Sequence, residues 1–271
     1  MSPDSQLQAV IAVAKAAGKC ILDVYESEDF DVTLKSLDSP LTRADVASHE
    51  LITQELRELS QLPILSEESK KTIPYEERAL WDRYWLVDPL DGTKEFIKRN
   101  GEFTINIALI RAGTPVLGVI HAPALSLIYY ALRGQGAFKQ TSEEAPTRLR
   151  ARNSAGGRLK IVASRSHRGP ALDEFLDRIK DYECLPVGSS LKFCAVAEGT
   201  AHLYPRLGPT MEWDTAAGQC IAEEAGAIVT DLQSKPLTYN KPNLVNPDFV
   251  VTVPHVNWQN WSNLKPTEPS K

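Results

Sequence analysis

Two aspartates separated by a proline and a leucine form the segment of this sequence with the clearest chemical potential. The segment DPLDGT, residues 88–93, follows an apolar, aromatic run at 84–87 that is typical of a buried strand. Pro89 fixes its own φ and keeps Asp88 extended, and the glycine of the segment permits a tight turn. We therefore expect Asp88 and Asp91 to lie close together at a strand end, beside free N–H groups of a following helix. Carboxylate oxygens suit Mg²⁺, and free N–H groups suit phosphate.

An Asp-rich turn taken alone is more often a plain strand ending than a metal site, but further acidic residues accompany this one. Glu67 follows a short apolar run and is expected to leave a second strand end. Asp214 and Asp45 each lie at or near the start of a predicted helix, where aspartate is also a favoured N-cap. Glu68 and Glu212 are expected to be solvated or to support the ligands, not to bind a metal.

Hydrophobic periodicity predicts the elements that must position these acids. Apolar residues at helical spacing predict helices over 7–22 and 45–59. Alternating and continuous apolar runs predict a series of strands at 64–65, 84–87, 103–110, 116–121 and 127–131. After a polar, Gly/Ser-rich stretch at 140–158, strands (159–163, 184–187, 201–204, 227–230, 249–253) alternate with helices (170–180, 189–198, 213–225). This order indicates an α/β (α+β) fold with two sub-domains, 1–145 and 146–271, each a sheet covered by helices.

Composition and charge exclude several classes of protein. The 271 residues are 42% hydrophobic and 24% charged with a net charge of −5, which favours a globular chain and argues against a general nucleic-acid-binding surface. Cys20, Cys184, Cys194 and Cys220 form no CxxC pair, so we interpret them as small core residues in a reducing compartment. We see no secretory signal and no apolar run of roughly 18 residues. We therefore expect a cytoplasmic protein, with peripheral association with the inner membrane left open.

Three motifs in order along the chain resemble those of a known superfamily. Glu67, the segment 88–93 and the segment WDTAAG at 213–218 resemble the metal-binding motifs of the Mg²⁺-dependent, lithium-sensitive phosphatases. This superfamily contains the inositol monophosphatases and the bisphosphate nucleotidases. The resemblance extends from the first predicted helix to about residue 230. It implies the layered α/β/α/β/α sandwich of the inositol monophosphatase and fructose-1,6-bisphosphatase type.

The resemblance implies a role for each acid. Four side chains and one backbone carbonyl would hold two or three Mg²⁺ ions: Glu67, Asp88, Asp91, Asp214 and the carbonyl of Leu90. All-oxygen ligation without His or Cys fits Mg²⁺ better than zinc, and two ions could clamp the attacking water and the leaving oxygen. Asp45 and Thr93 would activate the water as a pair, because a threonine hydroxyl alone is too weak a base.

Residues after the second aspartate indicate the substrate. Lys94 and Glu95 stand where inositol monophosphatases usually have Thr-Asn, and they resemble the bisphosphate nucleotidase branch, as do the segments 83–110, 162–167 and 188–194. A second phosphate on the substrate needs a cationic partner away from the metals. The expected substrate-binding residues are Glu67, Leu90, Asp91, Gly92, Thr93, His167, Ser189, Lys192, Arg206 and Asp214.

Four of these residues would recognise the part of the substrate away from the metals. Lys192 and Arg206 would bind the second phosphate, His167 the nucleoside, and Ser189 a phosphate or ribose oxygen. A solvated helix face is the alternative interpretation for Lys192, and a turn is the alternative for His167.

The resemblance implies a Mg²⁺-dependent phosphomonoesterase that converts adenosine 3′,5′-bisphosphate to AMP and phosphate. Such an enzyme would clear this by-product of sulfate assimilation and could also accept phosphoadenylyl sulfate. An inositol or sugar phosphate phosphatase on the same fold is the alternative. A catalytically silent regulator is disfavoured, because binding alone does not need Asp45 and Thr93. The expected partner is a small nucleotide, without a nucleic-acid polymer or integral membrane association, and the chain is expected to be a monomer or homodimer.

Overall fold

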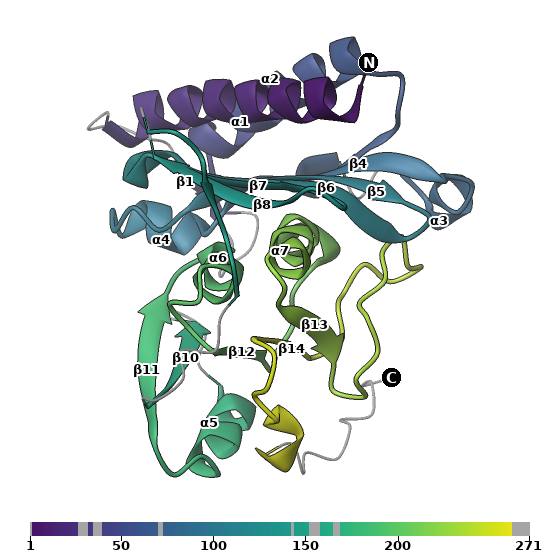
Figure 1. Ribbon diagram of the computed structural model, residues 1–271. Coiled ribbons are helices and arrows are strands. Elements are labelled where there is room, and N and C mark those ends of the chain that lie inside the picture. Colours follow the sequence, from purple (N-terminus) through teal and green to yellow (C-terminus); the bar gives the residue numbers. More distant parts are fainter. Residues whose placement is uncertain are drawn as a thin grey trace.

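Layers of helices and β-sheets alternate through the molecule (Figure 1). The computed structural model describes residues 2–26, 32–34, 40–69, 73–141, 144–151, 158–164 and 169–261. Helices α1 (Pro3–Glu26) and α2 (Arg43–Leu59) cover the outer face of the first sheet. Helices α6 (Leu191–Ala197) and α7 (Glu212–Glu224) lie between the two sheets, and α5 (Pro170–Asp177) covers the far face of the second. The predicted α/β/α/β/α sandwich is confirmed.

The first sheet has seven strands in sequential order. Its strands are β3 (Ile64–Ser66), β4 (Arg83–Asp91), β5 (Thr104–Arg111), β6 (Thr114–Ala122), β7 (Leu127–Leu132), β8 (Gly136–Thr141) and β9 (Thr147–Arg148). Strands β3 and β4 are parallel, and every other neighbouring pair is antiparallel. A Cβ at Gly118 of β6 would lie 2.6 Å from the carbonyl oxygen of Ala217, so this glycine lets α7 lie directly on the sheet. Helices on both faces explain why β4 and β5 are continuous apolar runs.

The second sheet has five strands in the order β11-β10-β12-β14-β13. Its strands are β10 (Leu159–Ser164), β11 (Tyr182–Val187), β12 (Leu203–Arg206), β13 (Ile228–Asp231) and β14 (Phe249–Thr252). Strand β10 is parallel to β11 and β12, whereas β14 is antiparallel to both of its neighbours.

Short elements connect these layers. They are β1 (Val32–Leu34) paired with β2 (Pro40–Thr42), α3 (Tyr75–Arg78), α4 (Thr93–Ile97), and the 3₁₀ helices η1 (Glu67–Ser69), η2 (Pro123–Leu125) and η3 (Trp258–Trp261). No helix within the described part of the chain is long and apolar enough to cross a membrane.

Apolar side chains fill each space between adjacent layers. One face of α1, including Val10, Ala14 and Ile21, packs with α2 against the first sheet. Between the sheets, Trp213 of α7 is buried with Phe193 of α6. A smaller cluster lies between α5 and the second sheet. The packing fixes the end of β4 and the start of α7, which carry the predicted acids.

The predicted helices and the predicted strands are present, and the structure adds two strands at or within the polar stretch at 140–158 that were not predicted. Strand β8 runs to Thr141, and β9 occupies Thr147–Arg148 within that stretch. These strands escaped prediction because the outer part of the sheet is half-buried or exposed and needs little apolar surface. The division into sub-domains 1–145 and 146–271 stays a prediction.

Candidate active site

The pairing of β3 with β4 places the first two acids at the same edge of the sheet. These strands are parallel, and Ser66, the last residue of β3, lies opposite Val87. Glu67 and Asp88 follow these two residues, so they leave neighbouring strands at the same level. The register of β3 and β4 is thus the first feature that brings the predicted acids together.

A β-bulge brings Asp91 to the same face of the sheet as Asp88. Asp88 lies opposite Asn106 of β5, and Asp91 lies opposite Thr104. Three positions on β4 therefore match two on β5, and the extra residue restores a common face for side chains that strict alternation would send to opposite faces. The two aspartates flank the Pro-Leu step as predicted.

Helix α2 and a local hydrogen bond hold the turn between these aspartates. The Ser48 hydroxyl of α2 donates to the carbonyl of Pro89 at 2.8 Å, and the N–H of Leu90 donates to Asp88 Oδ1 at 3.1 Å. Gly92 then adopts a φ of 87°, the left-handed region that favours glycine. Thr93 begins α4 directly after it.

The other two predicted acids come from helix starts. Asp214 is the third residue of α7, and its Oδ2 accepts a hydrogen bond from the N–H of Met211 at 2.8 Å. Asp45 is buried in the first turn of α2. Asp214 is therefore the third helical residue of a capping box whose N-cap is Met211, and not the N-cap of the alternative interpretation.

These acids interact electrostatically with one another and so form one site. Burial raises the pKa of Asp88 well above its ordinary value, and the charges of Glu67, Asp91, Asp214 and Asp45 raise it further. Burial and then Asp91 also raise the pKa of Asp214, to about 8, although the N–H of Met211 opposes the shift. Crowded carboxylates of this kind repel one another unless cations neutralise them.

The donor set fits a hard divalent cation, because every side chain in it offers only oxygen. Among the described residues, no three His, Cys, Asp or Glu side chains converge as a preformed metal cage. The fit to a metal therefore rests on the strand register that brings Glu67, Asp88 and Asp91 together and on the repulsion among the five acids, and not on a closed coordination geometry.

The raised carboxyl pKa values predict how stability depends on pH in metal-free protein. Between 3.8, the ordinary carboxyl pKa, and about 8, the folded chain binds more protons at Asp214 than the unfolded chain does. Stability must therefore fall as pH rises through this window. In chelator, we expect a lower unfolding temperature at pH 8 than at about pH 6, and Asp214→Asn should weaken this dependence. An unchanged pH dependence in the variant would contradict the assignment.

Two cationic side chains interact electrostatically with the acids: Lys192 with Asp91, and Arg206 with Asp214. Lys192 of α6 is buried, and its ammonium group donates to the carbonyl of Ser189 and lies 5.6 Å from the ring centroid of Tyr204. Burial lowers the pKa of Lys192 to about 8, with Arg206 lowering it and Asp91 raising it. A solvated helix face is therefore the wrong interpretation for Lys192.

Arg206 lies at the end of β12, and one of its N–H groups has no hydrogen-bond partner among the described residues. Its Nη2 donates to the carbonyl of Pro209 at 2.8 Å. Its Nε is buried and has no hydrogen-bond partner in the part of the chain that the structure describes. Such a group suits an anionic ligand, because an unpaired buried donor is costly.

Two of the predicted assignments remain open. His167 lies outside the described residues, so its contact with a nucleoside is untested. The pairing of Asp45 with the Thr93 hydroxyl also stays a prediction.

The structure adds polar residues that were not assigned a role. Thr104, Asn106 and Ser190 are buried together beside Asp91. The signal was present in the sequence, since polar residues at alternate positions of an otherwise apolar strand share one face.

Glu212 was expected to be solvated or supporting, and it is completely buried. It accepts hydrogen bonds from the N–H of Asn240 at 2.7 Å and from the Lys241 ammonium at 2.6 Å. These contacts fix the first turn of α7, so Glu212 is supporting and not solvated.

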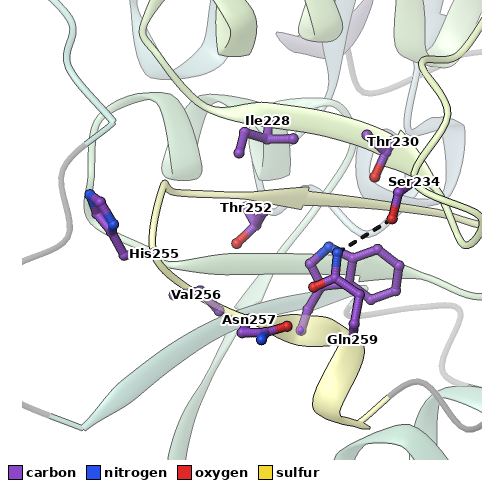
Figure 2. A pocket seen from close by; sticks show the side chains of 9 residues that line it. Ile228, Thr230, Ser234, Thr252, His255, Val256, Asn257 and Gln259 are labelled. Atoms are coloured by element: carbon purple, nitrogen blue, oxygen red, sulfur yellow. Dashed lines mark hydrogen bonds between the residues drawn. The ribbon is translucent and has the colours of Figure 1, made fainter.

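A cavity of about 370 Å³ lies at the edge of the second sheet, away from these acids (Figure 2). Gln259 donates to Ser234 beside it at 3.3 Å. The residues lining it are Ile228, Thr230, Ser234, Thr252, His255, Val256, Asn257, Trp258 and Gln259. None is a predicted site residue, so this cavity is separate from the candidate active site.

Known proteins share both the sequence and the fold. The family model described as "Inositol monophosphatase family" matches residues 3–261. The 3′(2′),5′-bisphosphate nucleotidase CysQ of Salmonella typhimurium is 49% identical over 91% of this chain and 99% of its own length. CysQ of Buchnera aphidicola is 42% identical over 89% of each chain.

A solved structure is similar as well. The crystal structure of CysQ from Bacteroides thetaiotaomicron, described as a bacterial member of the inositol monophosphatase family, has 43% identity and a TM-score of 0.81. The match covers 92% of this chain and 97% of that one.

Proposed function

The chain belongs to the inositol monophosphatase family, and on this premise we propose that it converts adenosine 3′,5′-bisphosphate to AMP and phosphate with Mg²⁺ as its cofactor. It is an enzyme, a 3′(2′),5′-bisphosphate nucleotidase on the inositol monophosphatase fold. The observation that carries the proposal is the position of Asp91: its Oδ2 accepts from the Ser190 N–H at the start of α6, the helix that carries Lys192, and its charge acts on Asp88, Asp214 and Lys192. One site can thus bind one phosphate through metal ions and a second phosphate through the Lys192 ammonium group.

Enzymes of this family are metal-dependent phosphatases. We assign Glu67, Asp88, Asp91, Asp214 and the carbonyl of Leu90 as the groups that would hold two or three Mg²⁺ ions. Bound Mg²⁺ would offset the charge of the scissile phosphate and make a water molecule more acidic.

The chain's own residues would supply the remaining chemistry. Thr93 would orient the attacking water and accept its proton, while Asp45 accepts the proton of the Thr93 hydroxyl. Lys192 and Arg206 would bind the 5′-phosphate through charge-assisted hydrogen bonds, and Ser189 would bond a phosphate or ribose oxygen. His167 would contact the nucleoside.

This activity would clear a by-product of sulfate assimilation, and phosphoadenylyl sulfate is a second candidate substrate. We propose a cytoplasmic location, because the four cysteines fit core residues of a protein in a reducing compartment, and we propose a monomer or homodimer.

Lys192→Met should lower kcat/KM for adenosine 3′,5′-bisphosphate and leave adenosine 3′-monophosphate almost unaffected. The methionine keeps the buried apolar stem and removes only the charge that would meet the 5′-phosphate. A charge-assisted hydrogen bond contributes about 1.5–3 kcal/mol, which corresponds to roughly ten- to hundredfold in kcat/KM. The measurement is phosphate release from both substrates by both proteins, a cycle with one arm in the substrate.

Lys139→Met is the matched control, because Lys139 also lies over a tyrosine ring, 5.5 Å from the centroid of Tyr129. It should affect neither substrate. Equal losses on both substrates with Lys192→Met would show that Lys192 supports the fold or the metal site instead.

A further inference from the structure

A cluster of four buried polar side chains lies directly behind Asp91. It consists of Thr104, Asn106, Ser189 and Ser190, and we call it the β5 polar cluster. Thr104 and Asn106 come from β5 of the first sheet, whereas the two serines directly precede α6. In the β4–β5 ladder, Thr104 lies opposite Asp91 and Asn106 lies opposite Asp88. The cluster therefore backs two of the proposed metal ligands at once.

One carboxylate oxygen of Asp91 receives two hydrogen bonds from this cluster. The backbone N–H of Ser190 donates to Asp91 Oδ2 at 2.7 Å, and the Ser189 hydroxyl donates to the same oxygen. Thr104 Oγ1 lies 2.5 Å from Ser189 Oγ and 2.7 Å from Ser190 Oγ. The Ser190 hydroxyl is 2.7 Å from Asn106 Oδ1 and donates to it.

Counting protons fixes the direction of these bonds. An ionised carboxylate only accepts, so the single hydroxyl proton of Ser189 goes to Asp91. The Thr104–Ser189 contact then requires the Thr104 proton, and the 2.7 Å Thr104–Ser190 contact requires the Ser190 proton, which Ser190 shares between Thr104 Oγ1 and Asn106 Oδ1. The order of donation is Thr104 to Ser189 to Asp91, and hydrogen bonds in such a chain polarise one another.

We propose that Thr104 is a positioning residue that acts on the metal through Ser189 and Asp91; this inference rests on the metal role of Asp91 in the proposed function. Two donors on Oδ2 leave Oδ1 as the oxygen that can bind a cation without losing these bonds. The cluster also fixes the distance between the acids and Lys192, since the Lys192 ammonium donates to the Ser189 carbonyl. Hydrogen-bond partners of metal ligands orient those ligands, and their loss typically costs 10–100-fold in metal affinity or activity.

Thr104→Val tests the proposal, because valine keeps the shape and removes the hydroxyl. We expect the Kd for Mg²⁺, measured by isothermal titration calorimetry on the full chain, to rise roughly tenfold or more. Thr252→Val is the matched control, since Thr252 is a buried threonine of β14 whose hydroxyl bonds only backbone carbonyls in the described part of the chain. The Kd of Thr252→Val for Mg²⁺ should equal that of the unmodified chain. Thr104→Ser keeps the hydroxyl, so its Kd for Mg²⁺ should equal that of the unmodified chain as well.

A purely structural role would give a different result. Thr104→Val would then lower the unfolding temperature in chelator, as Thr252→Val does, and leave the Kd for Mg²⁺ unchanged. That outcome would overturn the inference about Thr104 and leave the proposed function standing. If Thr104→Val does not fold, Ser189→Ala replaces it, because it removes the hydroxyl through which Thr104 acts on Asp91, and an unchanged Kd in that variant is equally contrary. If the unmodified chain binds no Mg²⁺, the proposed metal site and this inference both fail.

Discussion

Asp91→Asn is expected to abolish phosphate release while the chain stays folded. Asp91 is coupled electrostatically to Asp88, Asp214 and Lys192, so one lost charge alters the whole site. Asparagine keeps the shape and can still accept from the Ser190 N–H, but it is a weaker ligand for a hard cation. Phosphate release at several Mg²⁺ concentrations measures the effect.

The fold of this variant has its own expected result. Because one repelling carboxylate is removed, the unfolding temperature of Asp91→Asn in chelator should be no lower than that of the unmodified chain. Asp177→Asn is the control, because Asp177 is exposed and lies outside the candidate active site, and this variant should retain full activity. Near-normal turnover by Asp91→Asn at saturating Mg²⁺ would contradict the metal role of this residue.

Thr93→Ala should lower kcat by roughly 10²–10⁴, the usual contribution of general acid–base catalysis. Thr93 begins α4 directly after the Asp88–Asp91 turn, two residues beyond Asp91. Affinity for Mg²⁺ should change little. Steady-state kinetics at saturating Mg²⁺ separates kcat from metal binding.

An exposed threonine provides the comparison for this variant. Thr114→Ala, at the start of β6, should leave kcat unchanged. If Thr93→Ala instead weakened only Mg²⁺ binding, Thr93 would be a structural turn residue, and another group would have to activate the water.

The elements that hold the site could be predicted because their sequence patterns are local. Helical spacing over α1 and α2 and apolar runs in β4 and β5 directly reflect burial on one or two faces. Proline and glycine mark the turn between Asp88 and Asp91, so the strand end was visible without a structure.

The rest depends on contacts between distant residues. Glu212 carries no sequence signal of burial, because its partners Asn240 and Lys241 arrive from a loop 28 residues or more away. In the sequence, nothing distinguishes Lys192 from a surface lysine. Its burial depends on contacts with Ser189 and the Tyr204 ring, which only the fold creates. The β-bulge that aligns the two aspartates is likewise a property of strand pairing.

The most direct test of the proposed function compares two substrates. The purified full chain would be incubated with adenosine 3′,5′-bisphosphate or with inositol 1-phosphate, in Mg²⁺ and in chelator, and phosphate release would be followed. We predict Mg²⁺-dependent release with a much higher kcat/KM for the bisphosphate, and no release in chelator. Equal or better turnover of inositol 1-phosphate, or full activity in chelator, would contradict the account.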